Sequence, residues 1–186
     1  MIGVEDIREF VEGIYRENER GLIHGVEHTE RLVKDATKLA QPYIGEYDAE
    51  VLELSGMIHG VIHYGEEGIR KWLEEQGLDM ERVDRVISVA WESQAKSIPV
   101  SLEGKILHDA HYVEGGKEFH VLKPIIVGTE MGQSLEKTIE FIKGSMMEAP
   151  KYYLRESQQI FEEIHQYTQE FISNLEKQLY IEKGQI

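Results

Sequence analysis

The sequence of 186 residues contains no cysteine. This absence excludes disulfide frameworks, thiol nucleophiles, cysteine-based zinc fingers and iron–sulfur clusters. Any metal ion bound by this protein must therefore be held by histidine and carboxylate side chains.

Basic residues are scarce: 20 Lys and Arg stand against 35 Asp and Glu, and the formal net charge is −15. A surface of this charge repels phosphate backbones and anionic headgroups, so duplex nucleic acid and membranes are excluded as expected partners. A small anionic substrate stays compatible with the charge, because a bound divalent cation can supply a local positive field.

The chain also lacks long apolar runs and the alternating pattern of β-strands. No stretch of about 18 apolar residues is present. The first 20 residues alternate acids with apolar residues and resemble no secretory signal. We therefore expect a cytoplasmic protein of all-α class, with one helical-bundle domain over residues 1–186.

Apolar residues recur at helical spacing along most of the chain. The predicted helices cover residues 4 to about 21, 26–40, 49–63, a short stretch ending at 76, 80–92, a segment opening near 101, and a final pair within about 135–180. Residues 115–134 are rich in Gly and are expected to form loops around short pieces. The apolar stripe of the last helix could pack on the body or on a second subunit, so it permits a homodimer without requiring one.

The histidines are clustered in the sequence, and this pattern suggests a metal site. Six of the eight fall in three close pairs, His24/His28, His59/His63 and His108/His111. In the first two pairs the residues are four apart, which on a helix places both imidazoles on one face. The third pair flanks an aspartate, Asp109.

Helical projections at about 100° per residue place several of these residues toward the core. His28 and His59 lie on apolar faces and His63 at the edge of one. Asp109 borders an apolar face, whereas His108 points away from it. An ionised aspartate beside a core is costly unless it is paired or bound to a metal ion, so these residues could converge on one site.

Structural explanations compete with this hypothesis. An inward histidine can be a core residue bonded to a carbonyl group, and Asp109 can form an ion pair with Arg31 or Lys105. The remaining clustered histidines are expected at the surface, or in contact with the metal ligands and not with the metal ion itself: His24, His108 and His111.

Three segments resemble a known family. HGVEHTERL at 24–32, LSGMIHG at 54–60 and KILHDAHYVEG at 105–115 resemble, in order and separation, the motifs of the HD-domain phosphohydrolase superfamily. The similarity extends from about residue 20 to the C-terminal helix, with the motifs in a core of about 20–115. The resemblance implies an all-helical bundle that binds metal.

The resemblance also implies which residues bind the metal ion: His28, His59, the residue at position 60 and Asp109. Position 60 is Gly60, so the His-Asp doublet of the family is His-Gly here and one carboxylate ligand is missing. His63 is the nearest candidate to fill this vacancy. Imidazole in place of carboxylate would shift the metal preference from Mg or Mn toward Zn, Ni, Co or Fe.

A second departure lies at Trp91–Ser93, where relatives with two metal ions often carry histidine. We therefore expect one divalent transition metal ion, namely Mn, Ni, Co, Zn or Fe. By resemblance, the metal-bound water would be the attacking group on phosphorus. Arg31 and Lys105 are candidates for contacts to phosphate or to the ligands, although Arg31 can equally pair with Asp35.

Two functions follow from these observations. The first is a metal-dependent phosphohydrolase acting on a nucleotide or another small phosphate ester or anhydride. The second is a catalytically degenerate HD-domain module for binding or regulation, in which loss of the carboxylate at position 60 has abolished metal chemistry. They differ in whether the protein binds a metal ion and turns over a phosphate compound.

Overall fold

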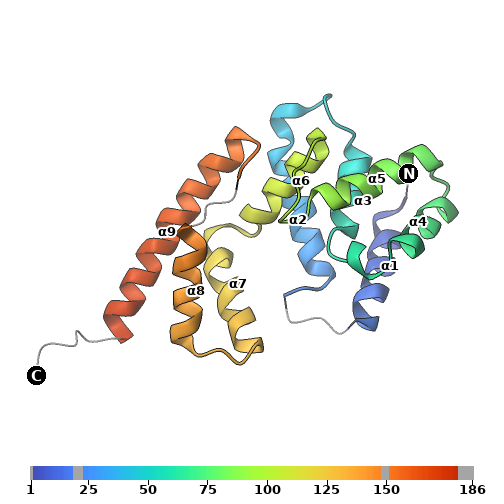
Figure 1. Ribbon diagram of the computed structural model, residues 1–186. Helices are drawn as coiled ribbons and strands as arrows, with labels where there is room; N and C mark the ends of the chain where they lie inside the picture. Colours follow the sequence, from blue (N-terminus) through green and yellow to red (C-terminus); the bar gives the residue numbers. More distant parts are fainter. Residues whose placement is uncertain (1, 19–22, 148–150, 180–186) are drawn as a thin grey trace, which may run out of the picture.

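A computed structural model describes residues 2–18, 23–147 and 151–179. These residues contain helices and no strand, which confirms the all-α prediction. The elements are α1 (Val4–Glu17), α2 (Val26–Leu39), η1 (Gln41–Tyr43), α3 (Ala49–Ile58), η2 (Ile62–Tyr64), α4 (Glu66–Glu75), α5 (Met80–Glu92), α6 (Leu102–Val113), α7 (Gly116–Glu130), α8 (Leu135–Met147) and α9 (Arg155–Leu179). Helices α1 to α6 form one bundle, and α7 to α9 lie beside it (Figure 1).

Side-chain caps determine where three helices of the bundle begin. Asp48 accepts hydrogen bonds from the first backbone N–H groups of α3, Asp79 does so for α5, and Ser101 for α6. Each cap accepts a hydrogen bond from a backbone N–H group that has no partner within the helix, and such a cap stabilises a helix start by about 1 kcal/mol. All three starts, after Asp48, at Met80 and near Ser101, are as the sequence predicts.

Helix α2 lies at the centre of the bundle and packs on α3 and α6. Its apolar face carries Leu32 and Ala36, which are fully buried. The same face carries His28. Because α2 brings this imidazole into the interior between α3 and α6, the packing of the core also positions a polar side chain there.

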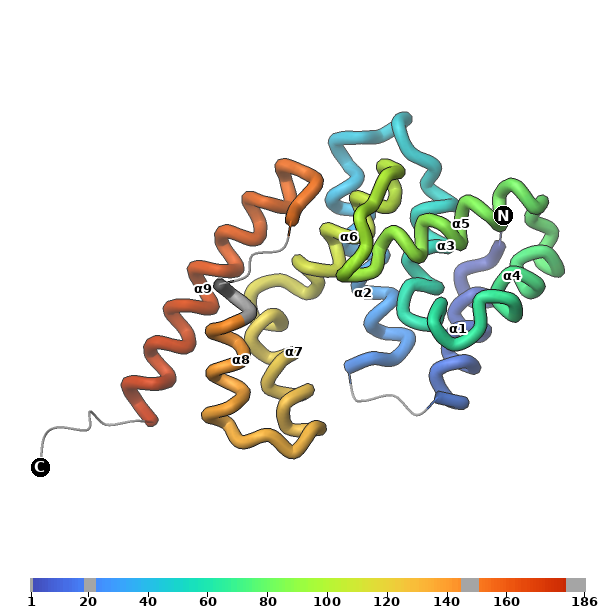
Figure 2. Tube along the Cα trace, viewed as in Figure 1, coloured from blue at the N-terminus to red at the C-terminus, as the bar shows by residue number. Residues whose placement is uncertain are grey.

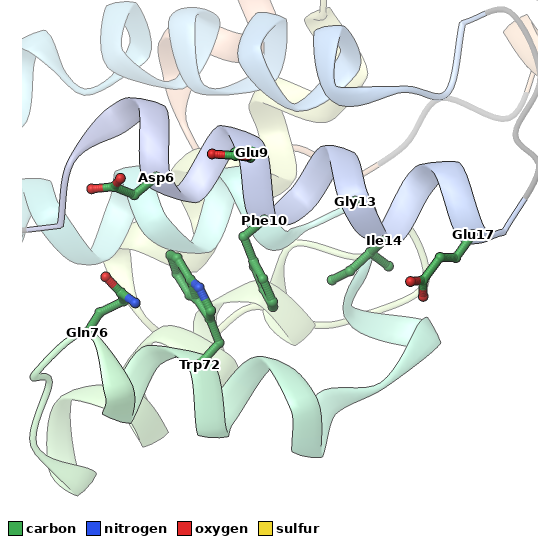
Figure 3. A pocket seen from close by; sticks show the side chains of 8 residues that line it. All are labelled: Asp6, Glu9, Phe10, Gly13, Ile14, Glu17, Trp72 and Gln76. Atoms are coloured by element: carbon green, nitrogen blue, oxygen red, sulfur yellow. The ribbon is translucent and has the colours of Figure 1, made fainter.

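Helices α1 and α4 are joined by an aromatic stack at one end of the molecule. The rings of Phe10 and Trp72 lie parallel, with centroids 4.3 Å apart (Figure 3). Stacked aromatic pairs of this kind add about 0.5–1.5 kcal/mol beyond burial. The stack therefore helps to fix α1 on the bundle.

Helices α7, α8 and α9 lie together beside the bundle (Figure 2). They have a small apolar cluster of their own, formed by Ile139, Ile142 and Ile172. The expectation of loops over residues 115–134 is wrong, because α7 runs through most of this stretch. Pro124 lies inside α7 and removes one backbone donor, but packing on α8 and α9 maintains the helix.

The prediction of one helix over residues 49–63 is also wrong. Helix α3 ends at Ile58, and the backbone then forms a tight turn in which the Val61 N–H donates to the Ile58 carbonyl oxygen at 3.0 Å.

In the described part of the chain, no helix is long and apolar enough to span a membrane.

Candidate metal centre

Three histidines converge from three different helices. His28 comes from α2, His59 from the end of α3 and His111 from α6, and each offers a ring nitrogen within 4.8 Å of the other two. Their ring centroids are 4.7 Å to 5.7 Å apart. We call these three residues the histidine triad. Imidazole nitrogens at such separations can bind one transition metal ion.

Glu114 determines the orientation of His28. Its Oε2 atom lies 2.9 Å from His28 Nδ1, and its side chain is buried. An ionised carboxylate can only accept hydrogen bonds, so Nδ1 carries a proton and Nε2 is the nitrogen through which His28 would bind a metal ion. A carboxylate behind a ligating imidazole also increases the basicity of that ligand.

Two cations contact the same carboxylate. Arg31 Nε donates to Glu114 Oε1 at 2.8 Å, and Lys123 Nζ donates to Oε2 at 3.0 Å. Burial alone would raise the pKa of Glu114, but the hydrogen bond and charge of His28, together with Lys123, lower it to about 2. Glu114 is therefore an anion throughout the physiological range.

Ser93 determines the orientation of His59. The Ser93 hydroxyl donates to the Ala90 carbonyl oxygen at 2.7 Å, so its oxygen accepts from His59 Nδ1, also at 2.7 Å. The Nε2 atom of His59 is thereby left with its lone pair. Gln94 holds the end of α3 by donating to the His59 carbonyl oxygen at 3.0 Å.

His111 provides a direct sign that the triad fits a cation. Its Nδ1 atom is buried and has no hydrogen-bond partner among the described residues. Burial, together with the charges of Lys123 and His28, lowers the pKa of His111 to about 3. Burial and the neighbouring His111 and His28 also hold the pKa of His59 well below its usual range. These two histidines are neutral, the form that binds metal, and the unpartnered nitrogen is one that a metal ion would satisfy.

Asp109 lies outside the triad. Its carboxylate is fully buried and accepts the backbone N–H groups of Tyr153 and Leu154, at 2.9 Å and 2.8 Å, just before α9 begins. It pairs with neither Arg31 nor Lys105, in contrast to the structural alternative. Asp109 thus joins α6 to the start of α9.

The other candidate ligand, His63, is also apart from the triad. Because α3 ends at Ile58, His63 does not lie one helical turn beyond His59 but on η2, where it is exposed. Its Nε2 atom lies 3.0 Å from Gln94 Oε1.

The two candidate phosphate contacts differ in position. Arg31 pairs with Glu114 rather than with Asp35, and its guanidinium lies over the Phe119 ring. Lys105 is half-buried on α6 and belongs neither to the triad nor to its hydrogen-bond partners in the described structure.

The remaining clustered histidines do not all lie where the sequence placed them. His24 is half-buried, with its ring centroid 6.2 Å from that of His28. The expectation that His108 points away from the core is wrong, because Tyr153 covers it and it is buried. A single-helix projection cannot include this later segment of the chain.

His111 is the functional candidate that sequence reasoning assigned to the surface or behind the ligands. A signal was present, because His111 lies one helical turn after the buried Leu107 and one turn before the buried Glu114. The sequence instead favoured Asp109 as the ligand from this helix, since a carboxylate beside the core also suggests metal binding.

Position 60 is closed to any side chain. A Cβ atom built on Gly60 would lie 1.8 Å from the Tyr15 hydroxyl oxygen and 3.5 Å from Thr29 Cγ2. The Tyr15 side chain, from α1, therefore occupies the space into which an aspartate at position 60 would extend. An aspartate at position 60 would therefore require the displacement of Tyr15.

A cavity of about 370 Å³ adjoins the triad. His111 and Glu114 line one part of it together with Lys123, and Val127 and Phe141 line another. A volume of roughly 300–1,000 Å³ is typical of small-molecule sites. The cavity is therefore large enough for a small ligand that reaches the triad.

The groove between α1 and α4 is larger, at about 500 Å³, but its chemistry is different. The carboxylates of Asp6, Glu9 and Glu17 line it along α1, and no histidine does (Figure 3). Three carboxylates would repel a phosphate. The cavity at the triad is the better candidate for an anionic ligand.

Comparisons with known proteins identify the architecture. No protein-family model matches the sequence, and a search of curated proteins finds no significant match. Among solved structures, Bacillus subtilis YpgQ in complex with ADP aligns with a TM-score of 0.71 and 17% identity, over 96% of this chain and 98% of YpgQ. An HD-superfamily hydrolase from Bacillus thuringiensis aligns with a TM-score of 0.69 and 20% identity, over 94% and 95% of the two chains. The chain has the HD-domain fold.

The HD-domain fold agrees with the resemblance carried by the sequence motifs. At identities of 17% and 20% the similarity establishes the fold alone, since folds host different functions. Any activity of this chain therefore depends on the chemistry of its own triad and cavity.

Proposed function

We propose that the protein is a metal-dependent phosphohydrolase that acts on a nucleotide or another small phosphate ester or anhydride through one divalent metal ion. The observation that carries this proposal is the histidine triad, whose His28 and His59 are oriented by buried partners and whose His111 has an unpartnered buried nitrogen. The HD-domain fold and the ADP bound to YpgQ are consistent with it.

His28, His59 and His111 would hold the metal ion. Three imidazole ligands favour Zn, Ni, Co or Fe over the oxygen-seeking Mg, and three protein ligands leave coordination positions for water and substrate. A bound divalent ion would supply Lewis-acid activation of water and of a phosphoryl oxygen.

The residues around the triad would bind and orient the substrate. Lys123 faces the cavity and carries a positive charge beside the triad, which suits it to contact a phosphate oxygen. Glu114 fixes Lys123 and His28 relative to one another through bonds of 3.0 Å and 2.9 Å to one oxygen. Arg31 acts through Glu114, and Lys105 is not among the residues that line the cavity.

A catalytically inactive binding module is the second candidate function. It is supported by Gly60, because the carboxylate ligand that the family resemblance implies is absent and Tyr15 occupies its space. In that case the cavity would bind a phosphorylated ligand without turnover.

Metal content and turnover distinguish the two functions. Elemental mass spectrometry of untagged protein should find about one transition metal ion per chain, lost in His59→Ala and His111→Ala but retained in the control His63→Ala, whose histidine is exposed outside the triad. With that metal, wild type and His63→Ala should hydrolyse at least one compound of a phosphate-ester and nucleotide panel. Turnover that persists in His111→Ala would contradict the proposal, and the absence of both bound metal and turnover in the wild type would favour the binding module.

A further inference from the structure

The cavity beside the triad has two chemically different ends. Its polar end carries Lys123 and His120 together with the triad residue His111. Its apolar end is formed by Val127 of α7 and Phe141 of α8. A ligand that fills it should therefore combine an anionic group with an apolar one.

The exposure of Phe141 is the unusual feature of the apolar end. The residue is 62% exposed, whereas its neighbour Ile142 is buried in the apolar cluster of α7 to α9. An exposed aromatic ring contributes little to the stability of the folded chain, since its apolar surface stays in water. An exposed aromatic ring that lines a cavity is, however, suited to stacking on a planar ligand.

The polar end favours phosphate as the anionic group. Lys123 is a cation with three donors, and among the described residues it donates to Glu114. His111, whose Nδ1 atom is buried without a hydrogen-bond partner in the described residues, lines the same cavity. The phosphate would thus lie between Lys123 and the triad, and the rest of the ligand would extend toward Phe141.

We propose that Phe141 is a specificity-determining residue, whose ring stacks on the base of a nucleotide while the phosphates lie at Lys123 and the triad. The substrate class is then a nucleotide, and phosphate compounds without a planar aromatic group bind less well. The part of this inference that concerns turnover rests on the proposed function, whereas the part that concerns nucleotide binding can be tested by itself.

Calorimetric titration of the full-length protein with ADP and with inorganic pyrophosphate tests the inference. Phe141→Ala should weaken ADP binding about tenfold, the size expected for losing one base–aromatic stack, and leave pyrophosphate binding unchanged. Phe141→Trp should restore ADP binding. Phe171→Ala is the matched control, because Phe171 is a partly exposed aromatic residue on α9 that does not line the cavity.

Three results would overturn the inference: no ADP binding by the wild type, unchanged ADP affinity in Phe141→Ala, or equal weakening of ADP and pyrophosphate. Thermal melting of each variant shows whether it is folded. If ADP binding depends on Phe141 but no nucleotide is hydrolysed, the phosphohydrolase proposal fails while the role of Phe141 in binding stands.

Discussion

Glu114 Oε2 lies 2.9 Å from His28 Nδ1, and this contact fixes which nitrogen of His28 faces the other two histidines. The carboxylate is buried and is contacted also by Arg31 and Lys123. Glu114 therefore connects the charges of Arg31 and Lys123 to His28, one of the three imidazoles of the triad.

Glu114→Gln should weaken metal binding about 10- to 100-fold, because a neutral amide no longer enforces the tautomer of His28 or increases its basicity. Competition with a chromogenic chelator measures the affinity. Glu118→Gln is the control, since Glu118 is exposed on the neighbouring helix α7. Equal affinities of Glu114→Gln and wild type would show that His28 does not need this carboxylate.

Asp109→Asn should lower stability rather than metal content. The backbone N–H groups of Tyr153 and Leu154 both donate to Oδ2, so an amide oxygen there would accept them without the negative charge that strengthens these bonds. The amide NH2 group would then take the place of Oδ1, which the Tyr153 N–H also approaches, at 3.2 Å. The free energy of unfolding should fall by about 1–3 kcal/mol in urea denaturation. Asp84→Asn, which breaks an exposed pair with Arg70, should cost about 0–1 kcal/mol. Loss of the metal ion from folded Asp109→Asn would instead make Asp109 a ligand.

Gly60→Ala should destabilise the protein by about 1–3 kcal/mol, because its Cβ atom would collide with the Tyr15 hydroxyl. The cost should be smaller in the Tyr15→Phe background, where that oxygen is absent. A double-mutant cycle of unfolding free energies measures the coupling between the two positions. Additive effects would mean that Tyr15 moves away freely, and the space at position 60 would then be open to a carboxylate.

The pH dependence of stability should include a contribution from His120. Burial, and then the charges of Lys123 and His165, lower the pKa of His120 in the folded protein. Below the ordinary pKa of about 6.5 the unfolded chain takes up a proton that the folded chain does not, so stability is lost as the pH falls. The melting temperature of His120→Gln should therefore fall less than that of the wild type when the pH is lowered from about 7.5 to 5. A parallel decline in both proteins would show that His120 titrates normally.

The sequence alone predicted the all-α class and the parts of the site that depend on one helix. The spacing of apolar residues placed His28 on the inward face of its helix, because a helix that buries one face fixes the direction of every side chain on it. His59 was likewise placed inward. The three motifs also indicated the HD-domain fold, with which the structural comparison agrees.

Tertiary structure decided which third residue joins these two histidines. Asp109 and His111 are two residues apart on α6, and their surroundings differ because α9 begins next to Asp109 while His28 and His59 face His111. Side chains two positions apart on a helix point in widely different directions, and only the packing of neighbouring helices shows what each one meets. The Tyr15 hydroxyl over Gly60 is likewise a contact between α1 and the end of α3 that no local pattern contains. The local sequence determined which side chains point inward, and the assembly of the helices determined which of them meet.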